Sequence, residues 1–415
     1  MKTHRVAVAL LLAHILSLLG FATYAVALTQ LQAEWGLSNS QAGWIASGFF
    51  IGYVIAVSTW SSLTDVVDAR KIYTAGSLIA ASGSMGFAIG AEGFFSAMFF
   101  QILLGVGIAA TYMPGLKILS DRTHGKEQSR FVAFYTAFFG LGAAASLYIT
   151  GLSLPRIGTQ WTFFLCALGP LLSALLVLSR TRPLAHERHP QPFRLDLQRL
   201  FPVKTWKQVL ADRACLGYTV GYGVHCAELF GSRAWMVAFL AFSVSLMPEG
   251  SITPISVATT AAIVSIFSVP SSILGNEIAL RIGRRAWIVL AMTITVVVGV
   301  LMALLAGSAW WLGFLLIALY SMLIMADSAT LTAGLVAAAD PRVKGAAMGL
   351  YSLIGFGLGG TLGPAIFGFA LDSAGGGQHS IDWAFAFMLL GMGCLLFPIF
   401  DWWLHRSNPF KKTSH

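Results

Sequence analysis

The order of apolar and polar positions divides this chain into twelve long apolar runs joined by short polar segments. Each run is about as long as the ~20 residues that a helix needs to cross the hydrocarbon core of a bilayer. The pattern therefore predicts an all-α membrane protein with twelve spans, numbered below in chain order. The runs lie at 6–29, 40–62, 72–91, 94–118, 131–153, 159–179, 214–242, 255–279, 286–307, 309–337, 346–371 and 383–404.

A polar stretch between spans six and seven separates two sets of six spans. We expect a six-helix bundle at 1–180, a central loop at 181–212 and a second six-helix bundle with a short tail at 213–415. Within the central stretch, basic residues alternate with apolar ones between Phe193 and Leu210. This pattern is typical of an amphipathic segment on the inner leaflet, although a solvated tether with some helix fits it equally well.

Composition and charge placement fix the class of protein. The chain is 57% hydrophobic and 10% charged, far from the roughly 25% charged residues of soluble domains. Its net charge of +9 does not indicate nucleic-acid binding, because 24 of the 26 Lys and Arg residues lie in the termini or in alternate loops. The positive-inside rule then places both termini and the central loop in the cytoplasm, beneath the cell inner membrane. The four cysteines have no CxxC spacing, so neither a disulfide framework nor a metal site is expected.

The two halves repeat short motifs in the same order. Span four ends in a Gly-Leu pair followed by Asp121, and span ten ends in a Gly-Leu pair followed by Asp340. Spans five and eleven then carry Phe-Gly-Leu-Gly, beginning at Phe139 and at Phe356. Duplicated halves of this kind are typical of secondary transporters.

The loops after spans two and eight carry a further motif. The first loop has Asp65 followed by Arg70 and Lys71, and the second has Arg281 and Gly283 followed by the basic pair Arg284 and Arg285. These loops resemble the motif of the major facilitator superfamily, in which Gly and Asp-Arg are followed by Gly-Arg-Arg or Gly-Arg-Lys. The first copy lacks the glycines and the arginine after Asp65, whereas the second has Leu280 in the place of the acid.

The resemblance covers nearly the whole chain and implies two six-helix bundles related by a pseudo-two-fold axis. It also implies that the two loops form a cytoplasmic gating motif, in which Asp65 interacts across the seam between the bundles. A simpler interpretation of Arg70, Lys71, Arg284 and Arg285 is that they only orient the loops, but this does not account for Asp65.

Charged or ionisable side chains within the spans fall in spans one, four, seven and ten. Ionisable groups at membrane depth are costly and by default indicate function. In the resembled family these four spans line the central cavity. We therefore expect a substrate and proton pathway that contains His14, Gln101, Tyr112, His225, Glu228, Arg233 and Asp327. Lys117 lies toward the inner end of span four, where it can also extend to the interface.

Span seven holds an acid and a base. Helical periodicity puts His225 and Glu228 on one face but separates Glu228 from Arg233 by about 140°. A direct pair would therefore need a break at Gly231; otherwise the two residues act separately. Arg233 would attract an anion, and Glu228 could then bind a proton. Asp327 has no basic partner within reach on its own helix, so it is either a proton carrier or a protonated, hydrogen-bonded carboxyl. His14 is either a core histidine or a relay.

These features together predict a secondary transporter that imports a small polar, anionic solute by proton symport and alternating access. It would need no cofactor and act as a monomer. Gln101 stands where many proton-coupled members of the resembled family have arginine, which argues against proton coupling, and span five lacks the Gly-Pro signature of drug antiporters. Alternatives are efflux of amphipathic compounds, a non-transporting membrane sensor, and a polytopic enzyme. The enzyme is disfavoured because the sequence has no P-loop and no nucleophile–base set.

Overall fold

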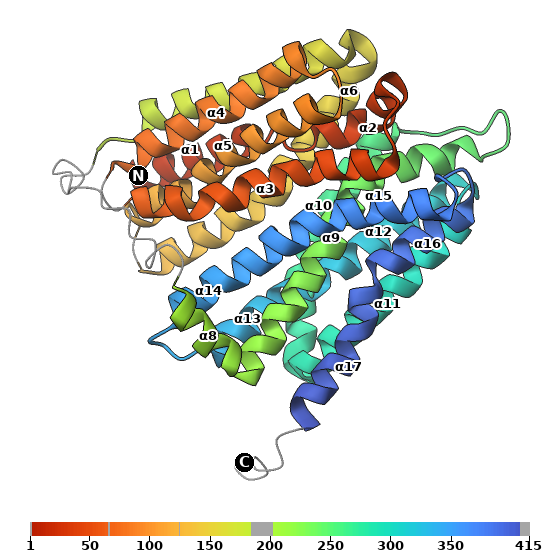
Figure 1. Ribbon diagram of the computed structural model, residues 1–415. Coiled ribbons are helices and arrows are strands. Elements are labelled where there is room, and N and C mark those ends of the chain that lie inside the picture. The colour runs from red at the N-terminus through yellow and green to blue at the C-terminus, as the bar shows by residue number, and fades with distance from the viewer. Residues whose placement is uncertain (1, 65–66, 124, 184–201, 407–415) are drawn as a thin grey trace. The chain divides into compact units, whose positions relative to one another are not determined.

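A computed structural model describes residues 2–64, 67–123, 125–183 and 202–406, and all of its regular elements are helices. The chain divides into two compact units (Figure 1). The first unit comprises Met1–Leu200, Ala234–Ala241 and Ser251–Ile266, and the second comprises Phe201–Arg233, Phe242–Gly250 and Phe267–His415.

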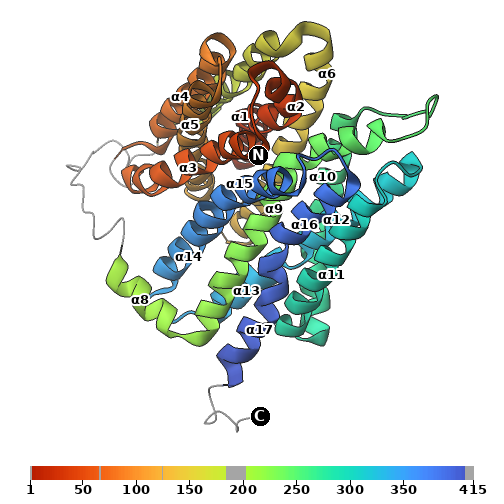
Figure 2. The same ribbon diagram turned by 45° about the vertical axis from the view of Figure 1, so that its right-hand side comes forward.

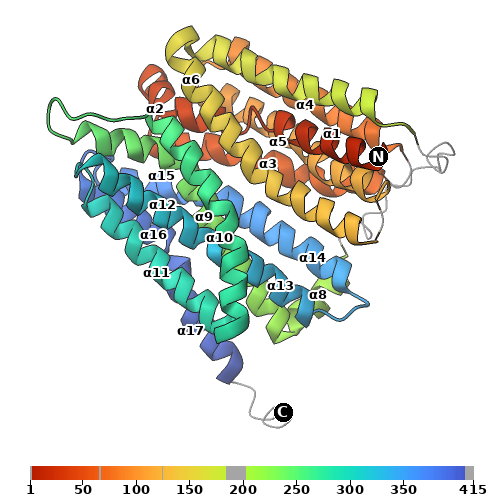
Figure 3. The same ribbon diagram turned by 180° about the vertical axis from the view of Figure 1, so that it is seen from behind.

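The first unit is built around helices α1 to α6. Helix α4 packs against both α5 and α6, α3 packs against α5, and α1 packs against α6. Helix α6 contains two of the expected spans, which meet in a sharp turn at Gly158, where φ is 76° and ψ is 175° (Figure 3). The bounds are α1 Lys2–Ser17, α2 Thr23–Trp35, α3 Asn39–Leu63, α4 Ala69–Gly90, α5 Phe94–Ser120 and α6 Gly125–Arg180.

The remaining helices lie wholly or largely in the second unit. Here α11 packs against α12, α16 and α17, and α15 packs against α16. The bounds are α8 Val203–Ala211, α9 Arg213–Ser245, α10 Val257–Ile282, α11 Arg284–Leu304, α12 Trp310–Ala326, α13 Ser328–Ala338, α14 Lys344–Ser352, the π-helix η2 Leu353–Gly359, α15 Gly360–Ala374, α16 Ser380–Leu390 and α17 Met392–Arg406.

The described residues contain ten helical stretches that are long and apolar enough to cross a membrane. One of them includes both parts of α6 and therefore represents two of the expected spans. The first expected span is divided into α1 and α2, each of which is too short to be counted among the ten. With these two differences, the helices account for the twelve apolar runs of the sequence.

Spans one and ten are interrupted, and side chains from neighbouring helices satisfy the exposed backbone at each of these breaks. Between α1 and α2, the Ser146 hydroxyl accepts a hydrogen bond from the Ala22 amide at 2.9 Å and donates to the Leu19 carbonyl at 2.6 Å. Such irregular backbone is tolerated at membrane depth only when protein groups satisfy it. Span one can therefore bend without leaving these polar groups unpaired.

Span ten is broken at Asp327, which separates α12 from α13. The Trp287 indole donates to the Ala326 carbonyl at 2.9 Å, and the Ser272 hydroxyl accepts from the Ala329 amide at 3.2 Å. The break is thus held from both sides by α11 and α10. Helices interrupted near the substrate site are a recurring device of secondary transporters.

Glycines allow α9 to pack closely against span eleven. A Cβ at Gly363 would lie 2.2 Å from the Ala227 carbonyl oxygen, and one at Gly231 would lie 2.8 Å from the Gly363 carbonyl oxygen. Helix α9 runs unbroken through Gly231 beside α15 (Figure 2). The break considered at Gly231 is therefore absent, and the glycine serves close helix packing.

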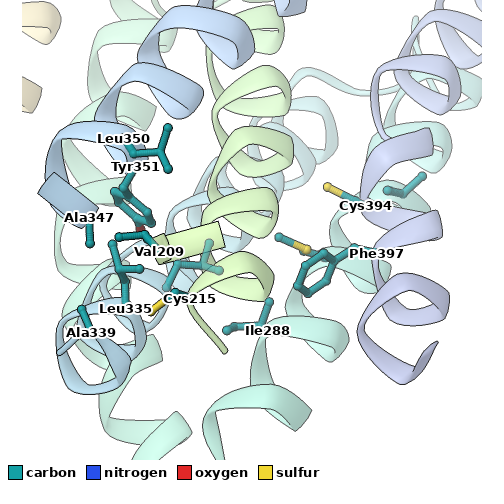
Figure 4. Packing of buried hydrophobic residues seen from close by; sticks show 13 residues of the cluster. Val209, Cys215, Ile288, Leu335, Ala339, Ala347, Leu350, Tyr351, Cys394 and Phe397 are labelled. Atoms are coloured by element: carbon teal, nitrogen blue, oxygen red, sulfur yellow. The ribbon is translucent and has the colours of Figure 1, made fainter. Parts of the chain in front are cut away.

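A buried apolar cluster in the second unit joins α8 to the helices that follow it (Figure 4). Val209 of α8 is 3% exposed and belongs to the same cluster as Leu335, Ala347 and Tyr351. The part of the expected amphipathic segment that precedes Pro202 lies outside the described residues. The part that is described packs into the second unit through Val209, while Lys204 and Lys207 remain exposed.

Candidate functional site

Two buried ionisable residues of the second unit meet where α9 passes the break of span ten. His225 Nδ1 lies 2.7 Å from Asp327 Oδ1, and both side chains are almost fully buried. His225 Nε2 has no hydrogen-bond partner among the described residues. Asp327 thus has a partner that helical spacing alone does not reveal, because the imidazole comes from another helix. Asp327 Oδ1 has no hydrogen-bond partner among the described residues either, so the contact is one of proximity and becomes an ion pair when the imidazole is protonated.

Aromatic rings stack beside this pair. The Tyr222 ring lies parallel to the His225 ring with centroids 5.7 Å apart and to the Tyr351 ring with centroids 3.8 Å apart. Tyr351 is also a member of the buried cluster that includes Val209. Two stacked rings, Tyr222 and Tyr351, therefore connect the His225–Asp327 contact to the buried cluster that includes Val209.

Glu228 lies one turn beyond His225 on α9 and has different partners. Its Oε2 accepts a hydrogen bond from the Cys394 thiol at 3.1 Å, and its Oε1 lies 3.5 Å from the Tyr320 hydroxyl. The carboxyl is 3% exposed. The second unit thus holds two buried carboxyl groups, Asp327 and Glu228, with separate sets of donors.

Arg233 is not paired with Glu228. Its guanidinium donates to the Ser268 hydroxyl at 3.4 Å, and among the described residues no carboxylate lies within ion-pair distance of it. The unbroken α9 keeps Arg233 and Glu228 on different faces, as helical periodicity predicts. The structure therefore contains no direct pair between the two residues, and what each of them does stays a prediction.

The first unit places His14 in an aromatic cluster. The imidazole is fully buried and stacks on Tyr135 with centroids 4.3 Å apart, and the Tyr112 ring lies 5.4 Å away. Neither nitrogen of His14 has a hydrogen-bond partner among the described residues. Gln101 is buried on the same helix as Tyr112, but the eleven-residue separation puts it about 16 Å away along the axis. Of the expected pathway residues in this unit, His14 and Tyr112 lie together and Gln101 does not join them.

Lys117 has a local partner. Its ammonium lies 3.4 Å from the carboxylate of Asp121, the residue that directly follows the end of α5, and both side chains are partly exposed. This pair accounts for Lys117 without a role in the pathway.

Arg70 connects the loop between α3 and α4 to the end of α6. Its guanidinium binds the carboxylate of Asp68, which caps α4, and donates to the Thr181 carbonyl at 2.8 Å. Burial alone would raise the pKa of the Asp68 carboxyl, but the hydrogen bonds and charge of Arg70, together with the charge of Arg122, lower this pKa below its ordinary value. Arg122 donates in addition to the Arg182 carbonyl at 2.7 Å. Asp65, the expected gating acid, lies outside the described residues, and Lys71 is exposed.

The second copy of the loop motif forms a corresponding connection to α17. Arg285 makes an ion pair of 2.7 Å with Asp401, whose side chain is 11% exposed. Gly283 has a φ of 95°, a conformation that favours glycine, and it directly precedes α11. Arg281 is exposed and Arg284 is partly buried. Each motif copy thus ties its loop to the last helix of its own six-helix set.

The site contains functional candidates that sequence reasoning missed. Cys394 and Tyr320 belong to the Glu228 site, but a lone cysteine and a lone tyrosine in apolar runs give no distinctive signal. Asp401 could have been identified from the sequence, because a carboxylate near the end of span twelve is the kind of partner that the basic pair after span eight requires. Asp68 could have been identified as well, since an acid two residues before Arg70, at the start of a helix, is a common cap.

Comparison with known sequences agrees with this architecture. The model of the Major Facilitator Superfamily matches residues 10–248 and 224–415. The chain is 24% identical to a putative tartrate transporter of Agrobacterium vitis over 391 residues, which cover 90% of this chain and 85% of that protein. It is 21% identical to the niacin transporter NiaP of Acinetobacter baylyi over 153 residues, 37% of this chain and only 34% of that relative's length.

Solved structures share the fold at low identity. A bacterial homolog of the human lysosomal transporter Spinster, in an inward-facing and unoccupied conformation, aligns over 100% of this chain and 99% of its own with a TM-score of 0.80 and 15% identity. The nucleoside transporter NupG aligns over 98% of this chain and 100% of its own with a TM-score of 0.76 and 15% identity. With the family model matching both halves and helices long enough to span a bilayer, the chain belongs to the major facilitator superfamily and is a multi-pass membrane transporter rather than an enzyme.

Proposed function

We propose that this transporter carries a small organic anion together with protons across the inner membrane, with both termini in the cytoplasm. The observation that supports proton coupling is the buried contact of 2.7 Å between His225 and Asp327 at the break of span ten. A proton added to Asp327 removes the charge that attracts a protonated imidazole. Proton binding would therefore loosen the contact between α9 and span ten.

Glu228 offers a second proton-binding group on the same helix. Its carboxyl is buried and accepts a hydrogen bond from the Cys394 thiol. A buried carboxylate with few donors is costly, so binding a proton is a cheap way to remove the charge. Gln101 stands where many proton-coupled members of the family have arginine. This difference does not oppose the proposed mechanism, because both proposed proton carriers lie in the second unit.

Arg233 supports the choice of an anionic solute. A guanidinium has five donors in a planar fork that matches a carboxylate. In the described structure it has the Ser268 hydroxyl nearby at 3.4 Å but no carboxylate partner. The names of two relatives are consistent with this class, since niacin and tartrate are both carboxylic acids. We further propose that the protein acts as a monomer. It would transport by alternating access, in which the two halves rock relative to each other.

The test uses the purified protein in liposomes with an imposed pH gradient, acid outside. Labelled nicotinate and tartrate are the probes. We expect accumulation of at least one of them above its equilibrium level, and collapse of that accumulation on adding a protonophore. Accumulation that ignores the gradient would refute proton coupling, and the absence of uptake would refute anion transport.

A pair of variants tests the anion anchor. Arg233→Gln should reduce uptake at least about tenfold, since a charge-assisted, bidentate contact is lost, and Arg233→Lys should retain part of it. Arg156→Gln is the matched control, because it removes an exposed guanidinium that lies outside both the proposed site and the loop motifs. Equal uptake by Arg233→Gln and the control would show that Arg233 does not anchor the solute.

A further inference from the structure

We propose that one face of α8, formed by Val203, Lys204, Lys207 and Leu210 and called the outward face below, binds the headgroups of anionic phospholipids. This inference goes beyond the proposed function, because it concerns neither the solute nor the protons. All of the residues that carry it belong to the second unit.

Helix α8 lies at the start of a membrane span. It ends at Ala211, and α9, which is long and apolar enough to cross a bilayer, begins at Arg213. Asp212 between them caps α9 by accepting a hydrogen bond from the Cys215 amide at 2.8 Å. The Arg213 guanidinium donates to the Leu404 carbonyl of α17 at 3.1 Å. The junction of α8 and α9 is therefore fixed at the level where span seven begins.

The length of α8 keeps it at the surface of the bilayer. Its nine residues extend about 13 Å along the axis, less than half of the ~30 Å of hydrocarbon in a bilayer. Because α8 directly precedes a span but is too short to cross, it lies in the interfacial region. Short amphipathic helices in this position lie along the surface, with basic residues toward the headgroups and apolar residues toward the acyl chains.

The two faces of α8 have different surroundings. Val209 is 3% exposed and belongs to the buried cluster, and α8 packs against α14 (Figure 3). Lys207 projects about 160° away from Val209 around the helix, and Val203, Lys204 and Leu210 each lie within about 60° of Lys207. Val203 is 52% exposed and Leu210 is 37% exposed. The outward face thus combines two large apolar side chains with two lysines.

The charge of the outward face determines which molecule it suits. Both lysines are exposed, and neither has a carboxylate within ion-pair distance among the described residues. At the surface of a bilayer, anionic headgroups attract lysine, and the acyl boundary beneath them accepts apolar side chains such as Val203 and Leu210. An anionic phospholipid therefore complements both parts of this face.

Lipid binding should hold α8 in place on the second unit. A ligand that binds only the folded, docked helix lowers the population of its locally unfolded form. Each lysine near an anionic surface strengthens binding about fivefold, so the pair should contribute about 25-fold. Local opening of α8 is the quantity that reports this effect.

The experiment measures amide hydrogen exchange of Val203–Ala211 in the full chain. One sample contains nanodiscs of phosphatidylcholine alone, and the other contains nanodiscs of phosphatidylcholine and phosphatidylglycerol in equal parts. We expect exchange in α8 to be at least about fivefold slower in the anionic nanodiscs. Peptides from the first unit provide the internal reference.

Variants connect the lipid effect to the outward face. Lys204→Gln/Lys207→Gln should abolish the difference between the two nanodiscs, since glutamine removes the charge but keeps a similar helix propensity. Lys204→Arg/Lys207→Arg should keep the difference. Arg180→Gln/Arg342→Gln is the charge-matched control, because both residues are exposed and lie outside α8 and the loop motifs. All of the replaced side chains are exposed, so each variant should fold, and unfolding temperatures in detergent check this.

Several outcomes would overturn the proposal. Exchange in α8 that is equally slow in detergent and in both nanodiscs would show that protein covers the outward face. Exchange that is equally fast in all three would show that the face is solvated. A difference that survives in Lys204→Gln/Lys207→Gln, or that is lost in the charge-matched control, would assign the effect to the net charge of the protein instead of to α8.

Discussion

His225 Nδ1 and Asp327 Oδ1 lie 2.7 Å apart, and their contact joins the unbroken α9 to the interrupted span ten. The break matters because it places Asp327 between two helices, α12 and α13, rather than in a continuous one. A change of charge at this residue therefore acts next to the Ala326 carbonyl and the Ala329 amide, which bond to the side chains of Trp287 and Ser272. This arrangement leads to the first prediction.

Asp327→Asn should abolish accumulation driven by a pH gradient while leaving exchange of solute across the membrane largely intact. The amide keeps the shape of the carboxyl but cannot bind or release a proton. We expect at least a tenfold loss of gradient-driven uptake, on the order of 1.4 kcal/mol or more. Counterflow of labelled solute without a gradient is the measurement that separates coupling from binding.

Asp340→Asn is the control, because Asp340 is half exposed and pairs with Arg342 after α13. Gradient-driven accumulation at the wild-type level in Asp327→Asn would remove Asp327 from the proton pathway. Loss of counterflow as well would show a role in binding or folding instead.

Cys394→Ala should weaken the Glu228 site, and Cys394→Ser should largely restore it. The alanine leaves the carboxyl without its donor at 3.1 Å, whereas the serine hydroxyl can donate in place of the thiol. A hydrogen bond to a charged group contributes about 1.5–3 kcal/mol. Thermal unfolding in detergent and the pH profile of uptake measure the two effects.

Cys166→Ala removes a buried thiol from the first unit and serves as the control. The proposed contact is contradicted if Cys394→Ser behaves like Cys394→Ala in both measurements.

Asp68→Asn should remove a pH-dependent part of the stability. The asparagine can still cap α4, but it carries no charge to attract Arg70. Because the folded pKa of Asp68 is lowered, its carboxylate stabilises the fold above the unfolded pKa of ~3.9, and this contribution disappears as the pH falls through the folded pKa. The difference from wild type should be on the order of 1 kcal/mol at pH 7.

Unfolding temperatures at a series of pH values provide the measurement. The difference between wild type and Asp68→Asn should stay constant from pH 7 to about pH 5 and decrease below about pH 4. A difference that grows on acidification would reverse the assigned sign.

Gly363→Ala should disrupt the second unit, whereas Gly349→Ala on the same span should be tolerated. A Cβ at Gly363 would lie 2.2 Å from the Ala227 carbonyl oxygen, but one at Gly349 has no heavy atom within 4 Å. Alanine favours a helix over glycine by about 1 kcal/mol, so Gly349→Ala should be neutral or stabilising. Monodisperse yield and unfolding temperature in detergent are the readouts, and equal behaviour of the two variants would contradict the close packing.

The sequence was informative where a pattern repeats along one helix, and less so where helices meet. Apolar run lengths predicted the spans, and periodicity separated Glu228 from Arg233 correctly. The break at Asp327 was not predictable, because the groups that satisfy it, Trp287 and Ser272, come from two other helices. The partner of Asp327 was hidden for the same reason. The roles proposed for the pathway residues remain predictions.

The burial of Val209 determines where the chain can be divided for work on the separate halves. Because this residue of α8 is buried with Leu335 and Ala347, residues that precede Arg213 already belong to the packed core of the second half. A coexpression experiment with two polypeptides should therefore divide the chain ahead of Pro202. A cut between α8 and α9 would leave Val209 on the wrong fragment and uncover the apolar surface that it occupies.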